Sequence, residues 1–209
     1  MGILLNISLD LDGCLSFFNY SFSVVANTLF GTPIVEDINE VKKYRWEDWH
    51  PLTKEQCNLT WREIDKNVED FWFNLKPLVN DSVFRKLEDL EYQGHSIYFI
   101  TSRRNTAGKN VLTQTNEWIR KYSFLQHFSV IPTEKKGKIL DGVKINYFID
   151  DYPENIIEAT IEAPKCKSYL LVREYNSYFL QFIKDSHKFK NIGIVYSVDA
   201  FLDEVENAT

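Results

Sequence analysis

Cysteine is scarce in this sequence, and the few cysteines present form no framework. Cys14, Cys57 and Cys166 lie far apart in the chain of 209 residues and include no Cys-x-x-Cys pair. Their number and spacing predict neither a zinc site nor a set of disulfide bonds. A reducing, cytoplasmic compartment is the simplest interpretation.

Long hydrophobic runs are also absent. A membrane-spanning helix needs about 20 consecutive apolar residues, and no window of the sequence reaches that length. The first residues do not combine a basic segment with an apolar run, as a signal peptide does. We therefore expect a protein without a membrane partner.

Basic residues are also fewer than acidic ones. Lysine and arginine together number 24 against 30 aspartates and glutamates, which gives a net charge of −6. Proteins that hold a long nucleic acid present a basic face, so we expect no such partner. A small anionic substrate fits this balance, because a bound divalent cation reverses the local charge. No feature of the sequence specifies an oligomeric state.

What the sequence does contain is an alternation of short apolar runs with longer amphipathic segments. The short runs are rich in Ile, Val, Phe and Tyr, as buried strands are. They cover residues 4–9, 96–100, 128–131, 147–149, 168–172 and 192–196. Helical spacing covers residues 81–92, 113–122 and 153–163. This alternation predicts an α/β fold, with a Rossmann-like, mostly parallel sheet between two layers of helices.

The segment 17–76 breaks the alternation. It contains no convincing strand and is crowded with aromatic residues, namely Trp46, Trp49, Trp61, Phe71, Trp72 and Phe73. We predict a mainly helical cap here, inserted after the first strand, so that residues 1–16 and 77–209 form the core. Most of these rings are expected to build the cap's own small core, and a minority to face a crevice.

Acidic and polar residues follow four of the predicted strands. In chain order they are Asp10-Leu11-Asp12-Gly13, Thr101-Ser102, Thr133-Glu134-Lys135-Lys136 and Asp150-Asp151. Open α/β sheets bind ligands at the carboxyl ends of their strands, so these side chains are expected to meet. Asp10 and Asp12 would point to the same side of a strand, where two negative charges need a cation or a shared proton. Carboxylates, a hydroxyl and a lysine together suit phosphoryl transfer through an aspartate.

The four motifs, in this order, resemble those of the haloacid dehalogenase superfamily of phosphatases, and they organise nearly the whole chain. The chain is further similar to the 5'(3')-deoxyribonucleotidase branch, which includes the cytosolic type C 5'-nucleotidases. The segments that carry this second resemblance are 12–18, 71–77, 133–136 and 149–151. The sequence departs from the branch in having Arg103-Arg104 after Thr101-Ser102, and in a longer spacer before Asp150.

The resemblance implies a role for each motif residue. Asp10 would be the nucleophile that forms an aspartyl-phosphate, and Asp12 would protonate the leaving oxygen and later activate water. Thr101, Ser102 and Lys136 would bind the phosphate. Two neighbouring lysines, Lys135 and Lys138, compete with Lys136 for this role.

The resemblance also implies a cofactor, Mg²⁺, which oxygen ligands favour. It would be held by Asp10, the backbone carbonyl of Asp12, and Asp151. Asp150 would be either a further ligand or a partner outside the ligand set. Phe18 would stack on the base of a nucleotide, although it could instead pack the hinge between cap and core.

These expectations together predict a Mg²⁺-dependent phosphomonoesterase for a small phosphate ester, in the first place a nucleoside monophosphate. A phosphatase for a sugar phosphate or a nucleic-acid end would use the same chemistry, and the net charge of −6 disfavours the second of these. A binding protein without catalysis is a further alternative. It is disfavoured because Asp10 and Asp12, which such a protein tends to lose, are both present.

Overall fold

The structure is a computed structural model that describes residues 3–186, 189 and 191–208. Its centre is a parallel sheet with the strand order β3-β2-β1-β4-β5-β6. The strands are β1 Asn6–Leu9, β2 Ser96–Thr101, β3 Phe128–Pro132, β4 Tyr147–Asp150, β5 Lys167–Leu171 and β6 Gly193–Val195. The predicted α/β class with a Rossmann-like parallel sheet is confirmed.

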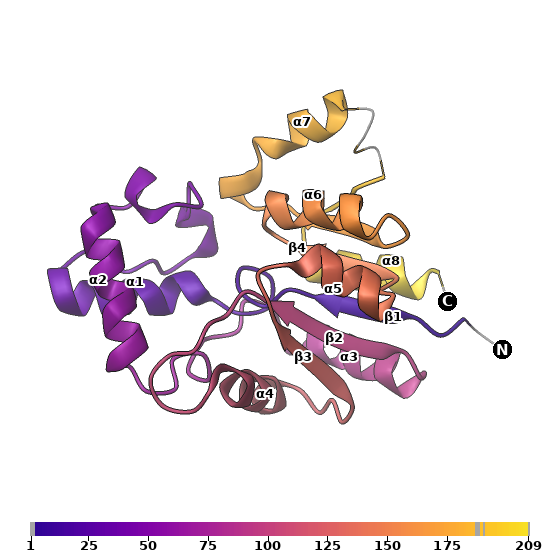
Figure 1. Cartoon of the computed structure of the whole chain (residues 1–209), viewed down its shortest axis with the longest axis horizontal. Helices are drawn as coiled ribbons and strands as arrows, with labels where there is room; N and C mark the ends of the chain where they lie inside the picture. Colours follow the sequence, from indigo (N-terminus) through magenta and orange to yellow (C-terminus); the bar gives the residue numbers. More distant parts are fainter. Residues whose placement is uncertain (1–2, 187–188, 190, 209) are drawn as a thin grey trace.

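Helices cover both faces of this sheet, which makes three layers (Figure 1). The helices of the core are α3 Asp81–Tyr92, α4 Val111–Tyr122, α5 Lys136–Val143, α6 Pro153–Glu162, α7 Phe179–Asp185 and α8 Val198–Glu206, with the short η3 Glu174–Asn176. Alternation along β4 explains the layers, because Tyr147 and Ile149 join one hydrophobic cluster and Phe148 joins the other. None of the described helices is long and apolar enough to cross a membrane.

The strand limits differ from the sequence expectation by one or two residues. β1 begins at Asn6 rather than at residue 4, because Asn6 is the first residue that pairs with β2, and Leu4 is exposed. β4 extends to Asp150, which pairs with Leu170 of β5. α4 begins two residues earlier than expected, where the Asn110 side chain accepts from the Thr113 N–H and caps the helix.

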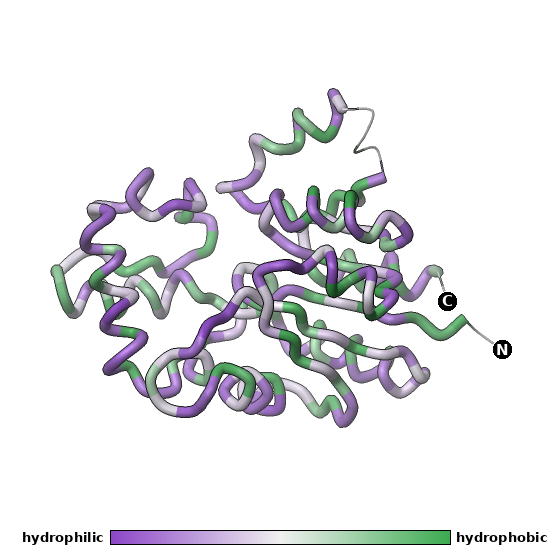
Figure 2. The backbone as a smooth tube through the Cα atoms, viewed as in Figure 1, coloured by the Kyte–Doolittle hydropathy of each residue, from purple (hydrophilic) through white to green (hydrophobic). Residues whose placement is uncertain are grey.

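Residues 17–76, all of which are described, form helices and contribute no strand to the sheet. The elements of this segment are α1 Phe18–Phe30, η1 Ile38–Glu40, η2 Trp46–Asp48 and α2 Lys54–Lys66. α2 begins at a capping box between Thr53 and Gln56. Figure 1 places α1 and α2 beyond the carboxyl ends of the strands, and much of α2 is hydrophilic in Figure 2. The boundaries of a separate cap domain stay a prediction.

Candidate active site

The strand order brings the predicted motifs to one edge of the sheet. β1 lies between β2 and β4, so the residues that end or follow these three strands are neighbours. The edge is the carboxyl end of the sheet, where the connections from the central strands diverge and leave a crevice. Thr101 ends β2, Asp10 follows β1, and Asp150 ends β4. All three line a single cavity of about 160 Å³.

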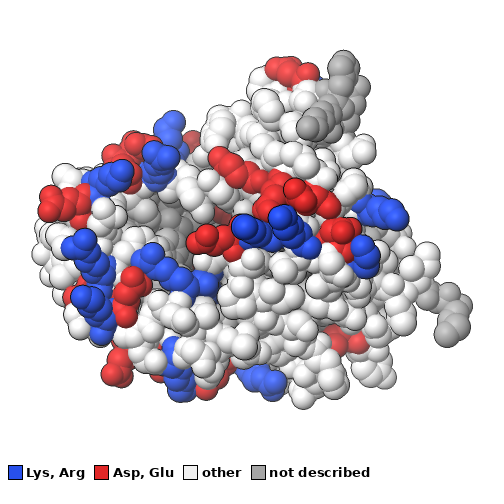
Figure 3. All heavy atoms as spheres, viewed as in Figure 1, with Lys and Arg blue, Asp and Glu red and all other residues white. Residues whose placement is uncertain are grey.

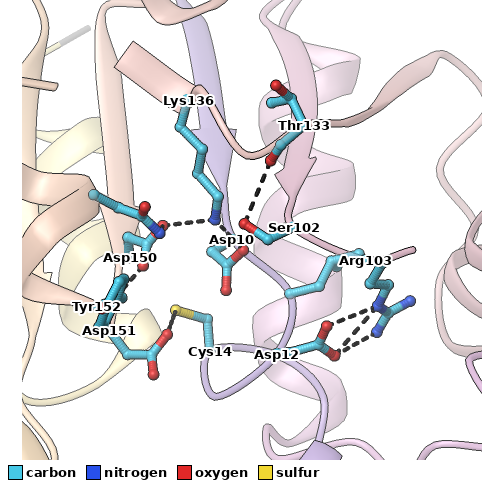
Figure 4. A network of polar contacts seen from close by, with 12 residues as sticks. Asp10, Asp12, Cys14, Ser102, Arg103, Thr133, Lys136, Asp150, Asp151 and Tyr152 are labelled. Carbon is cyan, nitrogen blue, oxygen red and sulfur yellow. Dashed lines mark hydrogen bonds and ion pairs between the residues drawn. The ribbon is translucent and has the colours of Figure 1, made fainter. Parts of the chain in front are cut away.

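Lys136 is a buried cation that lines this cavity. It begins α5, is only 1% exposed, and its ammonium group contacts Asp10 Oδ1 and, at 2.7 Å, Asp150 Oδ2 (Figure 4). Burial alone would lower the pKa of Lys136, but the attraction of the two carboxylates raises it above its usual value. The two competing lysines, Lys135 and Lys138, are exposed.

Both oxygens of the Asp150 carboxylate accept hydrogen bonds from the protein. Besides Lys136, it accepts hydrogen bonds from Asn155 Nδ2 at 2.9 Å and from the Tyr152 N–H at 2.8 Å. A carboxylate with both oxygens engaged in this way orients the lysine. Of the two roles expected for Asp150, this geometry favours the partner outside the metal ligand set.

Asp151 follows Asp150 in the chain, and both lie on the same side of Asp10 in Figure 4. Its Oδ2 accepts a hydrogen bond from the Tyr175 hydroxyl, and the Cys14 thiol lies 3.8 Å from its Oδ1. Gly13 makes this approach possible. Its φ is +89°, and a Cβ there would lie 2.7 Å from Asp151 Cγ and 2.9 Å from the Tyr175 hydroxyl oxygen, so both conformation and space require glycine.

Asp10 and Asp151 fit a divalent cation. One carboxylate oxygen from each of them and the Cys14 sulfur lie within 4.8 Å of one another. Burial raises the pKa of Asp10 well above its usual value, opposed by Lys136 and reinforced by Asp150. Burial and the neighbouring Asp150 raise the pKa of Asp151 to about 6. Two buried carboxylates that resist ionisation are the ligands that a hard cation such as Mg²⁺ would stabilise in the charged form.

The expected phosphate ligands of β2 differ in their surroundings. Thr101 is buried and lines the cavity, and its hydroxyl has no hydrogen-bond partner among the described residues. A buried hydroxyl without a partner is costly, so an anion in the cavity would satisfy it. Ser102 is exposed and donates from its hydroxyl to the Thr133 carbonyl at 3.3 Å.

Asp12 points away from the group formed by Asp10, Lys136 and Asp150 (Figure 4). Its carboxylate is held by the Arg103 guanidinium, with Nη2 2.8 Å from Oδ1 and Nε 3.0 Å from Oδ2. In the sequence, Arg103 stands out only as a departure from the pattern that the chain otherwise resembles. Its position directly after Thr101-Ser102 is the signal that could have placed it here.

Aromatic residues of the segment 17–76 form the opposite wall of the cavity. Phe18, the first residue of α1, stacks on Trp61 with ring centroids 5.4 Å apart and on Trp72 with centroids 6.1 Å apart. A second cavity of about 340 Å³ adjoins the first and shares Phe18, Trp61 and Tyr44 with it. On the face seen in Figure 3, acidic and basic side chains are interspersed rather than gathered into a basic stripe.

Comparison with known proteins gives both sequence and structural relatives. No model of a known protein family matches the chain. A "Putative nucleotidase" of Bacillus cereus is 34% identical over 131 residues, which are 61% of this chain and 64% of that protein. A second "Putative nucleotidase", from Oceanobacillus iheyensis, is 23% identical over 159 residues, or 74% and 78% of the two chains. The chain thus spans slightly less than two thirds of the first relative.

Solved structures resemble the fold over nearly its whole length. A haloacid dehalogenase-like hydrolase from Streptococcus pneumoniae has a TM-score of 0.58 at 10% identity and covers 97% of this chain and 98% of its own. A "Putative Phosphatase" from Clostridium difficile has a TM-score of 0.54 at 18% identity, with coverages of 96% and 99%. The chain therefore has the fold of the haloacid dehalogenase-like hydrolases.

Proposed function

We propose that this protein is a Mg²⁺-dependent phosphomonoesterase that works through an aspartyl-phosphate on Asp10. The observation that carries the proposal is the convergence of a carboxylate, an ammonium group and an unpartnered hydroxyl on one cavity. Asp10, Lys136 and Thr101 supply these groups from three separate elements. The fold of haloacid dehalogenase-like hydrolases supports the same chemistry.

The phosphoryl group would be transferred in two steps. The Asp10 carboxylate forms a bond to phosphorus while the bond from phosphorus to the ester oxygen breaks, and that oxygen takes a proton from Asp12. Water then attacks phosphorus and gives a proton to Asp12, while the bond between phosphorus and the Asp10 oxygen breaks. Inorganic phosphate leaves, and the Asp10 carboxylate is regenerated. Lys136 and the Thr101 hydroxyl hold oxygens of the phosphoryl group during both steps.

The residues that would hold Mg²⁺ are Asp10 and Asp151. When bound, the ion neutralises charge on the phosphoryl group and on the two carboxylates. Asp150 contributes through Lys136, whose ammonium group it keeps between itself and Asp10.

The substrate class proposed is the nucleoside monophosphates. The wall opposite the carboxylates is aromatic, and the adjoining cavity of about 340 Å³ offers room for the part of the substrate beyond the phosphate. A planar base gains stacking energy on such rings, whereas a sugar phosphate has no aromatic ring to stack on them. The names of the two sequence relatives support a nucleotide as well.

The test is phosphate release across a panel of nucleoside monophosphates, with sugar phosphates and an aryl phosphate for comparison. Each is measured with Mg²⁺, with EDTA, and with Asp10→Asn as the control that removes the nucleophile. We expect release that depends on both Mg²⁺ and Asp10 and is fastest for a nucleotide. Release that prefers sugar phosphates would retain the chemistry and reject the substrate, and no release from any ester would reject the proposal.

A further inference from the structure

Arg103 is a buried arginine without a role in the two steps of the proposed reaction. Its side chain is completely buried and donates hydrogen bonds to three residues. They are Asp12 through Nε and Nη2, Ser16 Oγ at 2.9 Å, and Thr115 Oγ1 at 3.3 Å. The guanidinium also lies over the ring of Trp72, 5.0 Å from its centroid. Such a planar, two-pronged contact fixes a carboxylate in position as well as in distance.

The contact determines where the Asp12 carboxyl group lies. Ser16 donates from its hydroxyl to Asp12 Oδ1 at 2.7 Å, so Arg103 and Ser16 hold the same oxygen from two directions. Figure 4 shows the Asp12 carboxylate beside Arg103 and separate from the group of Asp10 and Lys136. The group that transfers the proton is therefore placed by an arginine rather than by the phosphate-binding residues.

The next residue, Arg104, contacts the helical segment 17–76 instead. Its guanidinium lies 3.1 Å from Asp65 Oδ2 and 4.1 Å from the centroid of Trp61, and both of these residues belong to α2. Its carbonyl accepts a hydrogen bond from Trp72 Nε1 at 2.8 Å. Two consecutive arginines thus join Asp12 to α2.

We propose that Arg103 is a positioning residue for Asp12, and that Arg104 makes the position of Asp12 depend on the docking of α2. The proposal rests on the proposed function, because it assigns proton transfer to Asp12. It accounts for the Arg103-Arg104 pair, which distinguishes this sequence from the branch it resembles. A substrate that orders α2 against Arg104 would, by the same contacts, fix the residue that protonates its leaving oxygen.

Leaving-group dependence separates positioning from a merely structural role. The alkyl oxygen of a nucleoside monophosphate needs a proton as it leaves, whereas the oxygen of p-nitrophenyl phosphate leaves readily without one. A misplaced Asp12 therefore slows the alkyl ester much more than the aryl ester. A general loss of folding or of phosphate binding slows both to the same extent.

The experiment compares first-turnover release of the two leaving groups in wild type, Arg103→Met, Arg103→Lys and Asp65→Asn. We expect Arg103→Met to lower the alkyl-to-aryl rate ratio about 100-fold, as a displacement of about 1 Å can do. Arg103→Lys keeps the charge but loses the two-pronged contact, so we expect only partial rescue. Asp65→Asn, on α2 and remote from the phosphate, should lower the ratio about threefold, because it removes an exposed ion pair.

Glu117→Gln is the matched control. Glu117 lies on α4 and forms an ion pair with Lys109, which is on the same loop as Arg104. This ion pair is as exposed as the pair between Arg104 and Asp65, but it connects the loop to α4 instead of α2. The ratio should stay at the wild-type value. An equal fall in Glu117→Gln and Asp65→Asn would overturn the role of Arg104.

The outcomes distinguish the two proposals. No release from any ester by wild type rejects the proposed function, and the role of Arg103 with it. Release with an unchanged ratio in every Arg103 and Asp65 variant rejects only the positioning role. Thermal unfolding shows whether Arg103→Met folds. If it does not, the rate ratios of Arg103→Lys and Asp65→Asn test the positioning role, because both variants keep a cation at position 103.

Discussion

The two walls of the active-site cavity are built from different interactions. On the core side, Asp10, Lys136 and Asp150 are buried, ionisable and connected by polar contacts, and we call them the charged wall. On the α1 and α2 side, Phe18 and Trp61 stack with an angle of 17° between their rings. Polar contacts are directional, and aromatic contacts tolerate many partners.

We expect the charged wall to carry out the reaction and the aromatic wall to select the substrate. A change in the charged wall alters groups that any phosphate ester must meet, so its effect should be large and independent of the leaving group. The rings of the aromatic wall contact one another and would also contact a ring-bearing substrate, so the effect of a change there should be smaller and depend on the substrate.

Asp10→Asn should produce the largest effect, namely loss of turnover on every ester. An amide is a far poorer nucleophile than a carboxylate, and the loss should exceed the ~10² typical of a general acid or base. Burial raises the pKa of Asp10, which means that the charged carboxylate is unfavourable there. The variant should therefore remain folded, because asparagine is neutral and of the same size. Turnover above about a tenth of wild type would remove Asp10 as nucleophile.

Withdrawal of Mg²⁺ is the second test of the charged wall. EDTA should abolish release from alkyl and aryl esters alike, and added Mg²⁺ should restore it. Ca²⁺ takes more oxygen ligands at longer distances, so we expect it to bind and protect against thermal unfolding without restoring turnover. Equal rates with Ca²⁺, or full activity in EDTA, would contradict the metal assignment.

The charged wall was largely predictable from the sequence, and the reason is topological. The motifs of Asp10, Thr101 and Asp150 follow buried apolar runs, and parallel strands bring such ends to one edge. Helix and strand type for the core followed from the same runs, with limits shifted by one or two residues. The helical spacing of residues 81–92, 113–122 and 153–163 predicts α3, α4 and α6, and the core holds α5, α7 and α8 in addition.

The contacts between remote residues could not be predicted in the same way. Arg103 and Asp12 are 91 residues apart, and Tyr175 reaches Asp151 from a short helix that no motif marks. These pairs depend on side-chain packing rather than on periodicity. The aromatic wall shares this property, because the rings of segment 17–76 are abundant in the sequence but their choice of neighbours is set by the fold of α1 and α2.

Lys136→Met should cost less than loss of the nucleophile but act equally on all esters. Removing a contact to a developing phosphoryl charge typically costs a few kcal/mol, so kcat/KM should fall about 100-fold or more. Lys135→Met and Lys138→Met are matched controls, because both side chains are exposed and should leave kcat/KM near wild type. If kcat/KM were near wild type in Lys136→Met and strongly reduced in Lys135→Met or Lys138→Met, the phosphate contact would belong to that other lysine.

The stability of the metal-free protein should depend on pH through Asp151. Its pKa in the folded state is about 6 and exceeds the ordinary value of 3.8, so the folded state binds more protons than the unfolded state between these two values. The free energy of unfolding should therefore decrease as pH rises through this window. Urea unfolding in EDTA at several pH values measures it. Asp151→Asn should make the dependence less steep, and what remains comes in part from Asp10, whose pKa is also raised. A wild-type curve that rises across the window would contradict the assignment.

Phe18→Ala should give a smaller effect than Lys136→Met, and one that depends on whether the substrate carries a base. Loss of base stacking costs ~1–3 kcal/mol in single-strand binders, so KM for a nucleotide should rise about tenfold, the factor for ~1.4 kcal/mol. A small phosphate without a base should be nearly unaffected. Phe30→Ala, at the other end of α1 and outside both cavities, controls for damage to the helix. Equal loss on both substrates would show that Phe18 packs the hinge, and the aromatic wall would then support the cap rather than select the ligand.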